Sequence, residues 1–121
     1  MMEKGLFCGI NRPKGGNEKL EKAHVPLICV PERAKAGEPI QVTVRVGEEW
    51  HPMEEGHHIQ WIELHSKSNF LTRVDLTPVF TRPEVTVTLV KGALHKATTL
   101  RAVARCNLHG MWEGEAELEV D

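Results

Sequence analysis

The stretch Gln41-Val42-Thr43-Val44-Arg45-Val46 alternates polar and apolar side chains. Successive side chains of a β-strand point to opposite faces of the sheet, so strict alternation indicates a strand with one buried face. Residues 85–90 and 116–120 repeat the pattern. Glycine, proline and charged turn residues separate these segments. The sequence therefore predicts an all-β protein.

Short segments rich in β-branched residues recur at steady intervals after residue 24, without a helical period of convincing length. Seven strands are predicted near residues 25–30, 39–46, 57–65, 70–76, 84–90, 97–105 and 115–120. Such a series of short strands is typical of an antiparallel immunoglobulin-like β-sandwich. Residues 1–22 carry several glycines among charged residues and predict an irregular N-terminal arm. We therefore expect an arm over residues 1–22 and one β-sandwich domain over residues 23–121.

The composition is that of an ordinary globular domain. The chain has 121 residues, of which 40% are hydrophobic and 26% are charged, and its net charge is −2. This charge provides no basic surface for nucleic acid or for anionic lipid. The first twenty residues lack the apolar core of a signal peptide, and no run approaches a membrane span. The three scattered cysteines do not predict a disulfide framework, so we expect a cytoplasmic protein.

Candidate metal ligands lie at the predicted strand ends and in the loops between strands. In Cys106-Asn107-Leu108-His109-Gly110 a thiolate and an imidazole lie three positions apart, in a loop where Gly110 can adopt a positive φ. His24, His51 and His57 could complete the same site. Loops at one end of a rigid sandwich are where binding sites are usually built. The sequence thus predicts a metal site with four imidazoles and one thiolate.

The nature of these donors favours a redox metal. Magnesium and calcium prefer oxygen ligands, and structural zinc requires only four donors. Five nitrogen and sulfur ligands leave one octahedral position open, which suits an iron ion that binds a small molecule. His58 should point away from its neighbour on a strand, and Cys29 is interpreted as a small buried hydrophobic residue. Trp50 and Trp112 lie close to candidate ligands in the sequence and could form an apolar wall of the metal site.

Two alternatives belong to other functional classes. A non-enzymatic electron carrier of the blue-copper type is also a β-sandwich, with two His, one Cys and a weak axial Met as ligands. Met111 invites this reading, but it lies only two residues beyond His109, and four histidines are two more than such a site uses. The second alternative is an interaction module whose histidines bind no metal. Metal analysis with an absorption spectrum distinguishes iron, copper and no metal.

Three motifs, in this order, resemble those of the superoxide reductases, specifically the one-iron neelaredoxin type. The resemblance runs from about Glu21 to the C-terminus and rests on His24-Val25-Pro26, on His51-Pro52 followed by His57-His58-Ile59-Gln60-Trp61-Ile62-Glu63-Leu64, and on Cys106-Asn107-Leu108-His109-Gly110-Met111-Trp112. It implies a mononuclear iron (Fe2+/Fe3+) with axial Cys106 and with equatorial His24, His51, His57 and His109. Only Cys8 precedes the first ligand, so the four-cysteine iron centre of the desulfoferrodoxin branch is not expected.

The same resemblance implies an activity and its partners. Ferrous iron would reduce superoxide by one electron, with uptake of two protons, to hydrogen peroxide, and rubredoxin would supply the electron. A homo-oligomer, either a dimer or a tetramer, is expected. In the family Glu-Lys directly precedes the first ligand, whereas here Ala23 separates Glu21-Lys22 from His24. We expect Lys22 still to attract the anionic substrate and Glu21 not to bind oxidised iron.

Overall fold

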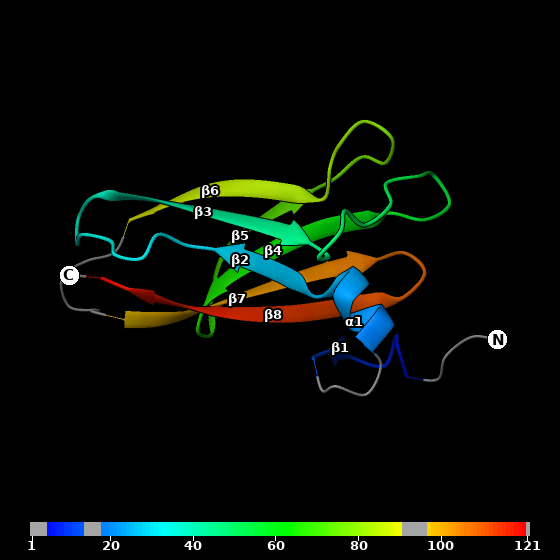
Figure 1. The fold of residues 1–121 in the computed structure, drawn as a ribbon, viewed down its shortest axis with the longest axis horizontal. Coiled ribbons are helices and arrows are strands. Elements are labelled where there is room, and N and C mark those ends of the chain that lie inside the picture. Colours follow the sequence, from blue (N-terminus) through cyan, green and yellow to red (C-terminus); the bar gives the residue numbers. More distant parts are fainter. Residues whose placement is uncertain (1–4, 14–17, 91–96, 121) are drawn as a thin grey trace.

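The computed structural model describes residues 5–13, 18–90 and 97–120, and two β-sheets packed face to face form its body (Figure 1). The first sheet has the order β1-β8-β7-β4-β5 and the second has the order β2-β3-β6. The elements, in chain order, are β1 (Ile10–Asn11), α1 (Glu18–His24), β2 (Pro26–Cys29), β3 (Pro39–Val46), β4 (Ile59–Ser66), β5 (Asn69–Asp75), β6 (Glu84–Val90), β7 (Ala97–Cys106) and β8 (Gly110–Glu119).

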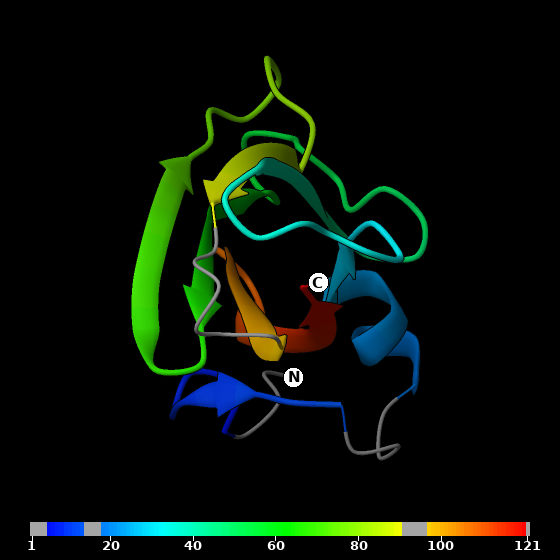
Figure 2. The same ribbon diagram turned by 90° about the vertical axis from the view of Figure 1, so that its left-hand side faces the viewer.

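The predicted β-sandwich is confirmed, and each of the seven expected strands is present. All pairings among β2 to β8 are antiparallel. Viewed along the strands, the two sheets enclose a common interior (Figure 2). Every second side chain of β3 points into this interior. Val42, Val44 and Val46 are fully buried, whereas the residues between them are more exposed. Ile62, Leu64 and Leu100 belong to the same core cluster.

The N-terminal part differs from the irregular arm that the sequence predicted. β1 is an additional, eighth strand, and it pairs in parallel with β8. α1 is a short helix with Glu18 and Glu21 in its first turn and Lys22 and His24 in its last turn. This charge order suits the helix dipole. His24 therefore ends a helix instead of opening a strand. Helices in the described part of the chain fall short of the length and apolarity that a membrane crossing needs.

The hairpin of β7 and β8 contains the tight loop that the sequence predicted between Cys106 and Gly110. The two strands pair from Ala97 with Glu119 to Cys106 with Gly110. Gly110 has a φ of 81°, as its position in the loop predicted. A Cβ atom on this residue would lie 2.2 Å from the carbonyl oxygen of Leu6. The loop end is thus fixed both by backbone conformation and by close packing of the arm.

Replacing Gly110 with alanine should therefore destabilise the protein by about 2–3 kcal/mol, the sum of a positive-φ cost and a steric clash. Gly37 is the matched control, since its φ is 80° but no atom lies within 4 Å of its Cβ position. Gly37→Ala should cost only about 1 kcal/mol. Urea unfolding of the iron-free variants measures both changes. Equal losses would mean that the contact with Leu6 does not constrain the loop.

Candidate metal centre

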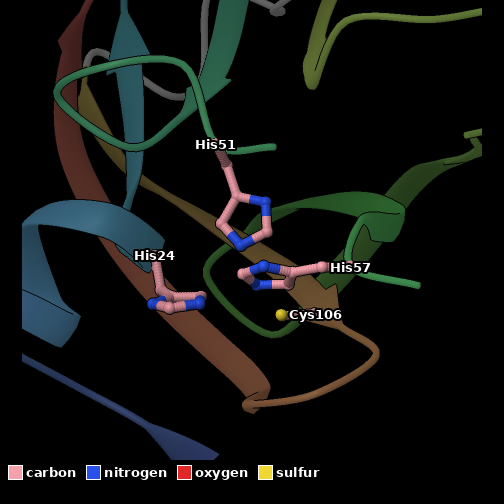
Figure 3. Close-up of side chains that lie close together, drawn as sticks. All are labelled: His24, His51, His57 and Cys106. Atoms are coloured by element: carbon pink, nitrogen blue, oxygen red, sulfur yellow. The ribbon is translucent and has the colours of Figure 1, made fainter. Parts of the chain in front are cut away.

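Four of the predicted ligands converge at one end of the sandwich. His24 comes from the end of α1, His51 and His57 come from the segment between β3 and β4, and Cys106 ends β7. Their donor atoms all lie within 4.8 Å of one another, and the three imidazoles lie close to the sulfur (Figure 3). His24 and His51 are each 3% exposed, and Cys106 is fully buried. The four groups form a potential metal site.

His109 lies against this group from the β7–β8 loop. Its ring centroid is 4.8 Å from that of His24 and 5.3 Å from that of His57. Its Nδ1 atom is 3.5 Å from the sulfur of Cys106. The structure therefore gathers all five residues that the sequence singled out, four in a tight group and His109 beside it.

Hydrogen bonds fix the orientation of two imidazoles. The Nδ1–H of His24 donates to the carbonyl oxygen of Leu20 at 2.8 Å, and that of His51 donates to Pro52 at 2.8 Å. A carbonyl only accepts, so Nδ1 carries the proton and Nε2 has a free lone pair. Bonds of this kind are how proteins orient histidine ligands toward a metal.

The free nitrogens show that the site fits a metal ion. The Nε2 atoms of His24, His51 and His57 are buried and have no hydrogen-bond partner. Buried polar atoms are normally paired, because an unpaired one costs about 1–3 kcal/mol. A cation bound among these atoms would satisfy all three nitrogens at once. Imidazole and thiolate donors are characteristic of iron, copper and zinc, not of magnesium or calcium.

Burial sets the protonation state of the candidate ligands. It lowers the pKa of His24 and that of His51 to about 4, and it also lowers the pKa of His57. These imidazoles are therefore neutral and able to bind a metal near pH 7. Burial raises the pKa of the Cys106 thiol, while the backbone N–H groups of Leu108 and His109 act in the opposite direction. These N–H groups thus favour the thiolate form of Cys106.

Asn107 joins the two loops that carry the ligands, a role that the sequence did not reveal. Its Oδ1 accepts the backbone N–H of His58 at 2.8 Å, and its Nδ2 donates to the carbonyl of Gly56 at 3.0 Å. Its own N–H donates to the carbonyl of His58 at 3.1 Å. The segment around His57 is therefore held against the residue that follows Cys106. The one available signal was an amide side chain directly after the cysteine.

Other predicted residues lie outside the group of donor atoms. His58 bonds through Nδ1 to the carbonyl oxygen of Glu54 at 3.1 Å and does not belong to the group, as expected. The buried position predicted for Cys29 is wrong, because Cys29 is exposed. Trp112 stacks on His24 with ring centroids 5.3 Å apart, whereas Trp50 is 43% exposed. Only Trp112 forms the predicted apolar wall.

Lys22 is exposed on α1, beside a pocket of about 470 Å³ that reaches His51. Lys19 lines the same pocket, and Glu48 and Glu49 form part of its wall. The N–H of Glu48 donates to the carbonyl oxygen of Lys22 at 2.8 Å, which holds the end of α1 on the turn after β3. A solvent-accessible pocket thus connects two cationic side chains to one of the candidate ligands.

Comparisons with known proteins identify the family to which the chain belongs. A family model described as Desulfoferrodoxin matches residues 16–115. The chain is 46% identical over 114 residues to a protein of Methanocaldococcus jannaschii, covering 93% of this chain and 95% of that relative. It is 37% identical over 113 residues to a superoxide reductase of Pyrococcus abyssi, covering 88% of this chain and 95% of that relative.

Solved structures give the same result. The superoxide reductase (neelaredoxin) from Ignicoccus hospitalis superposes with a TM-score of 0.79 at 38% sequence identity. The superposition covers 93% of this chain and 95% of that one. The chain therefore belongs to the desulfoferrodoxin family, in its one-iron superoxide reductase branch.

Proposed function

We propose that this protein reduces superoxide to hydrogen peroxide at an iron ion bound by His24, His51, His57, His109 and Cys106. The observation that carries the proposal is the buried group of imidazole nitrogens without partners around a cysteine sulfur. The proposed site has four imidazoles and one thiolate, whereas a blue-copper site uses only two histidines and one cysteine. A copper electron carrier is therefore not favoured. Membership of the superoxide reductase family supports the same function.

The reaction adds one electron and two protons to superoxide and yields hydrogen peroxide. Bound iron would supply the electron and an open position for the anion. A bound metal would favour the thiolate form of Cys106, and the N–H groups of Leu108 and His109 act in the same direction. Such N–H bonds tune how strongly a sulfur ligand donates to iron. Lys22, which lines the pocket that reaches His51, attracts the anionic substrate.

The remaining partners follow from the family resemblance. We propose rubredoxin, or a similar small electron-transfer protein, as the donor that returns the iron to the ferrous state. A homodimer or homotetramer is the expected assembly. A cytoplasmic location is supported by the three free cysteines, since reduced thiols persist in that compartment. Size-exclusion chromatography with light scattering measures the assembly, and reduction kinetics with purified rubredoxin test the donor.

Replacing Cys106 with serine should abolish the sulfur-to-iron charge-transfer absorption and reduce superoxide reduction by more than about tenfold. The reason is that no other cysteine belongs to the group of close donor atoms in the described part of the chain. Cys29→Ser is the matched control, because Cys29 is exposed on β2 and should leave the spectrum unchanged. Absorption spectra and stopped-flow rates measure both variants. Retention of the absorption band in Cys106→Ser would refute the assignment of Cys106 as a ligand.

Alanine substitutions should separate His57 from its neighbour His58. His57→Ala removes one of the unpaired Nε2 atoms and should lower iron occupancy by about tenfold under limiting iron. His58→Ala should leave iron bound, since its ring bonds to the carbonyl of Glu54. Inductively coupled plasma mass spectrometry gives the iron content of each variant. Equal losses in the two variants would show that His57 is not a specific ligand.

Removal of the Lys22 charge should slow the second-order reaction with superoxide by up to about tenfold at low ionic strength. The difference from the wild type should shrink as salt screens the charge. Lys35→Ala is the control, since exposed Lys35 lies in the β2–β3 connection at the opposite end of the sandwich (Figure 1). Pulse radiolysis at several salt concentrations measures these rates. An unchanged salt dependence in Lys22→Ala would exclude steering by this residue.

Glu21→Ala should leave the spectrum of oxidised iron almost unchanged. Glu21 is not among the close donor atoms of the described residues, and its carbonyl oxygen accepts the N–H of Val25 in the last turn of α1. A crystal structure of the oxidised protein with the Glu21 carboxylate bound to iron would contradict this expectation.

The stability of the iron-free protein should fall as the pH decreases from about 6.5 to about 4. The unfolded histidines bind protons near pH 6.5, whereas the pKa of folded His24 and that of folded His51 are about 4. The unfolded state therefore gains more protons over this range, and each histidine contributes a loss on the order of 2–3 kcal/mol. Urea unfolding at a series of pH values measures the slope. His24→Leu should remove its share, and a slope equal to that of the wild type would contradict the assignment.

A further inference from the structure

Residues 5–13 are the first described part of the predicted N-terminal arm and are called the arm from here on. They lie against the beginning of β8, directly after the ligand loop 106–110. β1 pairs there with Met111 and Trp112, on the edge of the first sheet (Figure 1). The Desulfoferrodoxin family model matches the chain only from residue 16 onward, so the arm lies outside the matched region. The contacts of the arm with Gly110 and Met111 point to a role of its own.

The side-chain amide of Asn11 joins the arm to the residue after the ligand loop. Its Nδ2 group donates to the carbonyl oxygen of Leu6 at 2.9 Å and to that of Met111 at 2.8 Å. Both N–H bonds of the amide are thereby used. The same Leu6 carbonyl occupies the space where a Cβ atom of Gly110 would lie, at 2.2 Å. Through these two hydrogen bonds, Asn11 holds the arm against Gly110, the last residue of the loop.

An ion pair between exposed Arg12 and the buried carboxylate of Glu113 anchors the arm further along β8. The guanidinium of Arg12 donates to the carboxylate of Glu113 at 2.6 Å, and Arg101 donates to its other oxygen at 2.8 Å. The Glu113 side chain is only 3% exposed. Burial alone would raise the pKa of Glu113, but the hydrogen bonds from the two arginines lower it. The anchor therefore stays ionised near neutral pH.

The anchored residues are coupled directly to the candidate ligands. Gly110 pairs with Cys106 at the end of the β7–β8 hairpin. The indole N–H of Trp112 donates to the carbonyl oxygen of His109 at 2.9 Å, and its ring stacks on His24. A displacement of the first residues of β8 would consequently move the loop that contains Leu108 and His109, whose backbone N–H groups favour the ionised form of the Cys106 sulfur.

We propose that Asn11 is a positioning residue of the metal centre: it fixes the arm on Gly110 and Met111 and thereby keeps the N–H groups of Leu108 and His109 directed at the Cys106 sulfur. The part of this inference that concerns iron rests on the proposed function. Loss of the Asn11 bonds would loosen the loop and weaken the N–H bonds to sulfur. A thiolate with weaker N–H bonds donates more strongly and lowers the reduction potential of its metal.

The first test uses the iron-free protein, so that its result does not depend on the reductase activity. In Asn11→Ala, amide hydrogen exchange at residues 106–110 should be about tenfold faster than in the wild type, as expected for a loss of about 1.4 kcal/mol of local stability. Asn11→Asp should accelerate exchange at least as much, because a carboxylate has no N–H to donate. Gln41→Ala, which removes an amide that bonds to Thr88 on the other sheet, should leave these residues unchanged.

Arg12→Ala provides a second variant should Asn11→Ala fail to fold. Arg12 is the more exposed anchor, and Glu113 keeps its bond to Arg101, so a smaller acceleration at residues 106–110 is expected. Unchanged exchange at these residues in folded Asn11 variants, or in Arg12→Ala if those do not fold, would overturn the proposal. Wild-type exchange in Asn11→Asp alone would also overturn it, since the side chain would then act by shape and not by donation.

The second test uses the iron-loaded protein. Asn11→Ala should shift the sulfur-to-iron charge-transfer band and lower the reduction potential, while Gln41→Ala changes neither. An unchanged band and potential would overturn the proposed tuning of iron. If the wild type bound no iron, the proposed function would fail, but the exchange experiment would still decide whether Asn11 positions the ligand loop.

Discussion

One electrostatic constraint dominates this molecule: three buried imidazole nitrogens beside a buried thiol have no hydrogen-bond partner among the described residues. Unpaired buried polar atoms oppose folding, and burial keeps His24 and His51 neutral and raises the pKa of Cys106. A bound cation would satisfy the nitrogens, would bind the imidazoles in their neutral form and would favour the thiolate. Metal binding and stability of this end of the sandwich are therefore linked.

The sandwich supplies the rigidity that such a group requires. β7, which ends at Cys106, is hydrogen-bonded to β4 on one side and to β8 on the other. The histidines come from less regular segments, and each segment has a specific attachment: Leu20 and Pro52 orient two rings, and Asn107 ties the segment before β4 to the ligand loop. Asn11 extends this attachment to the N-terminal arm.

The sequence predicted features that follow from local pattern or residue type. Alternation located the strands, and the chemistry of His and Cys at strand ends located the ligands. α1 was missed because seven residues are too few to show a helical period. The start of β8 was missed because Trp112, Glu113 and Gly114 are all buried and do not alternate. Cys29 was misplaced because β2 is an edge strand, whereas its apolar run suggested burial on both faces. The roles of Asn107 and Asn11 depend on contacts between distant segments.

X-ray absorption spectroscopy at the iron edge, combined with metal analysis of the purified protein, tests the proposed metal centre. We expect a stoichiometric iron ion with one sulfur neighbour, from Cys106, and a shell of imidazole nitrogens. Copper in place of iron, or iron without a sulfur neighbour, would refute the proposed centre.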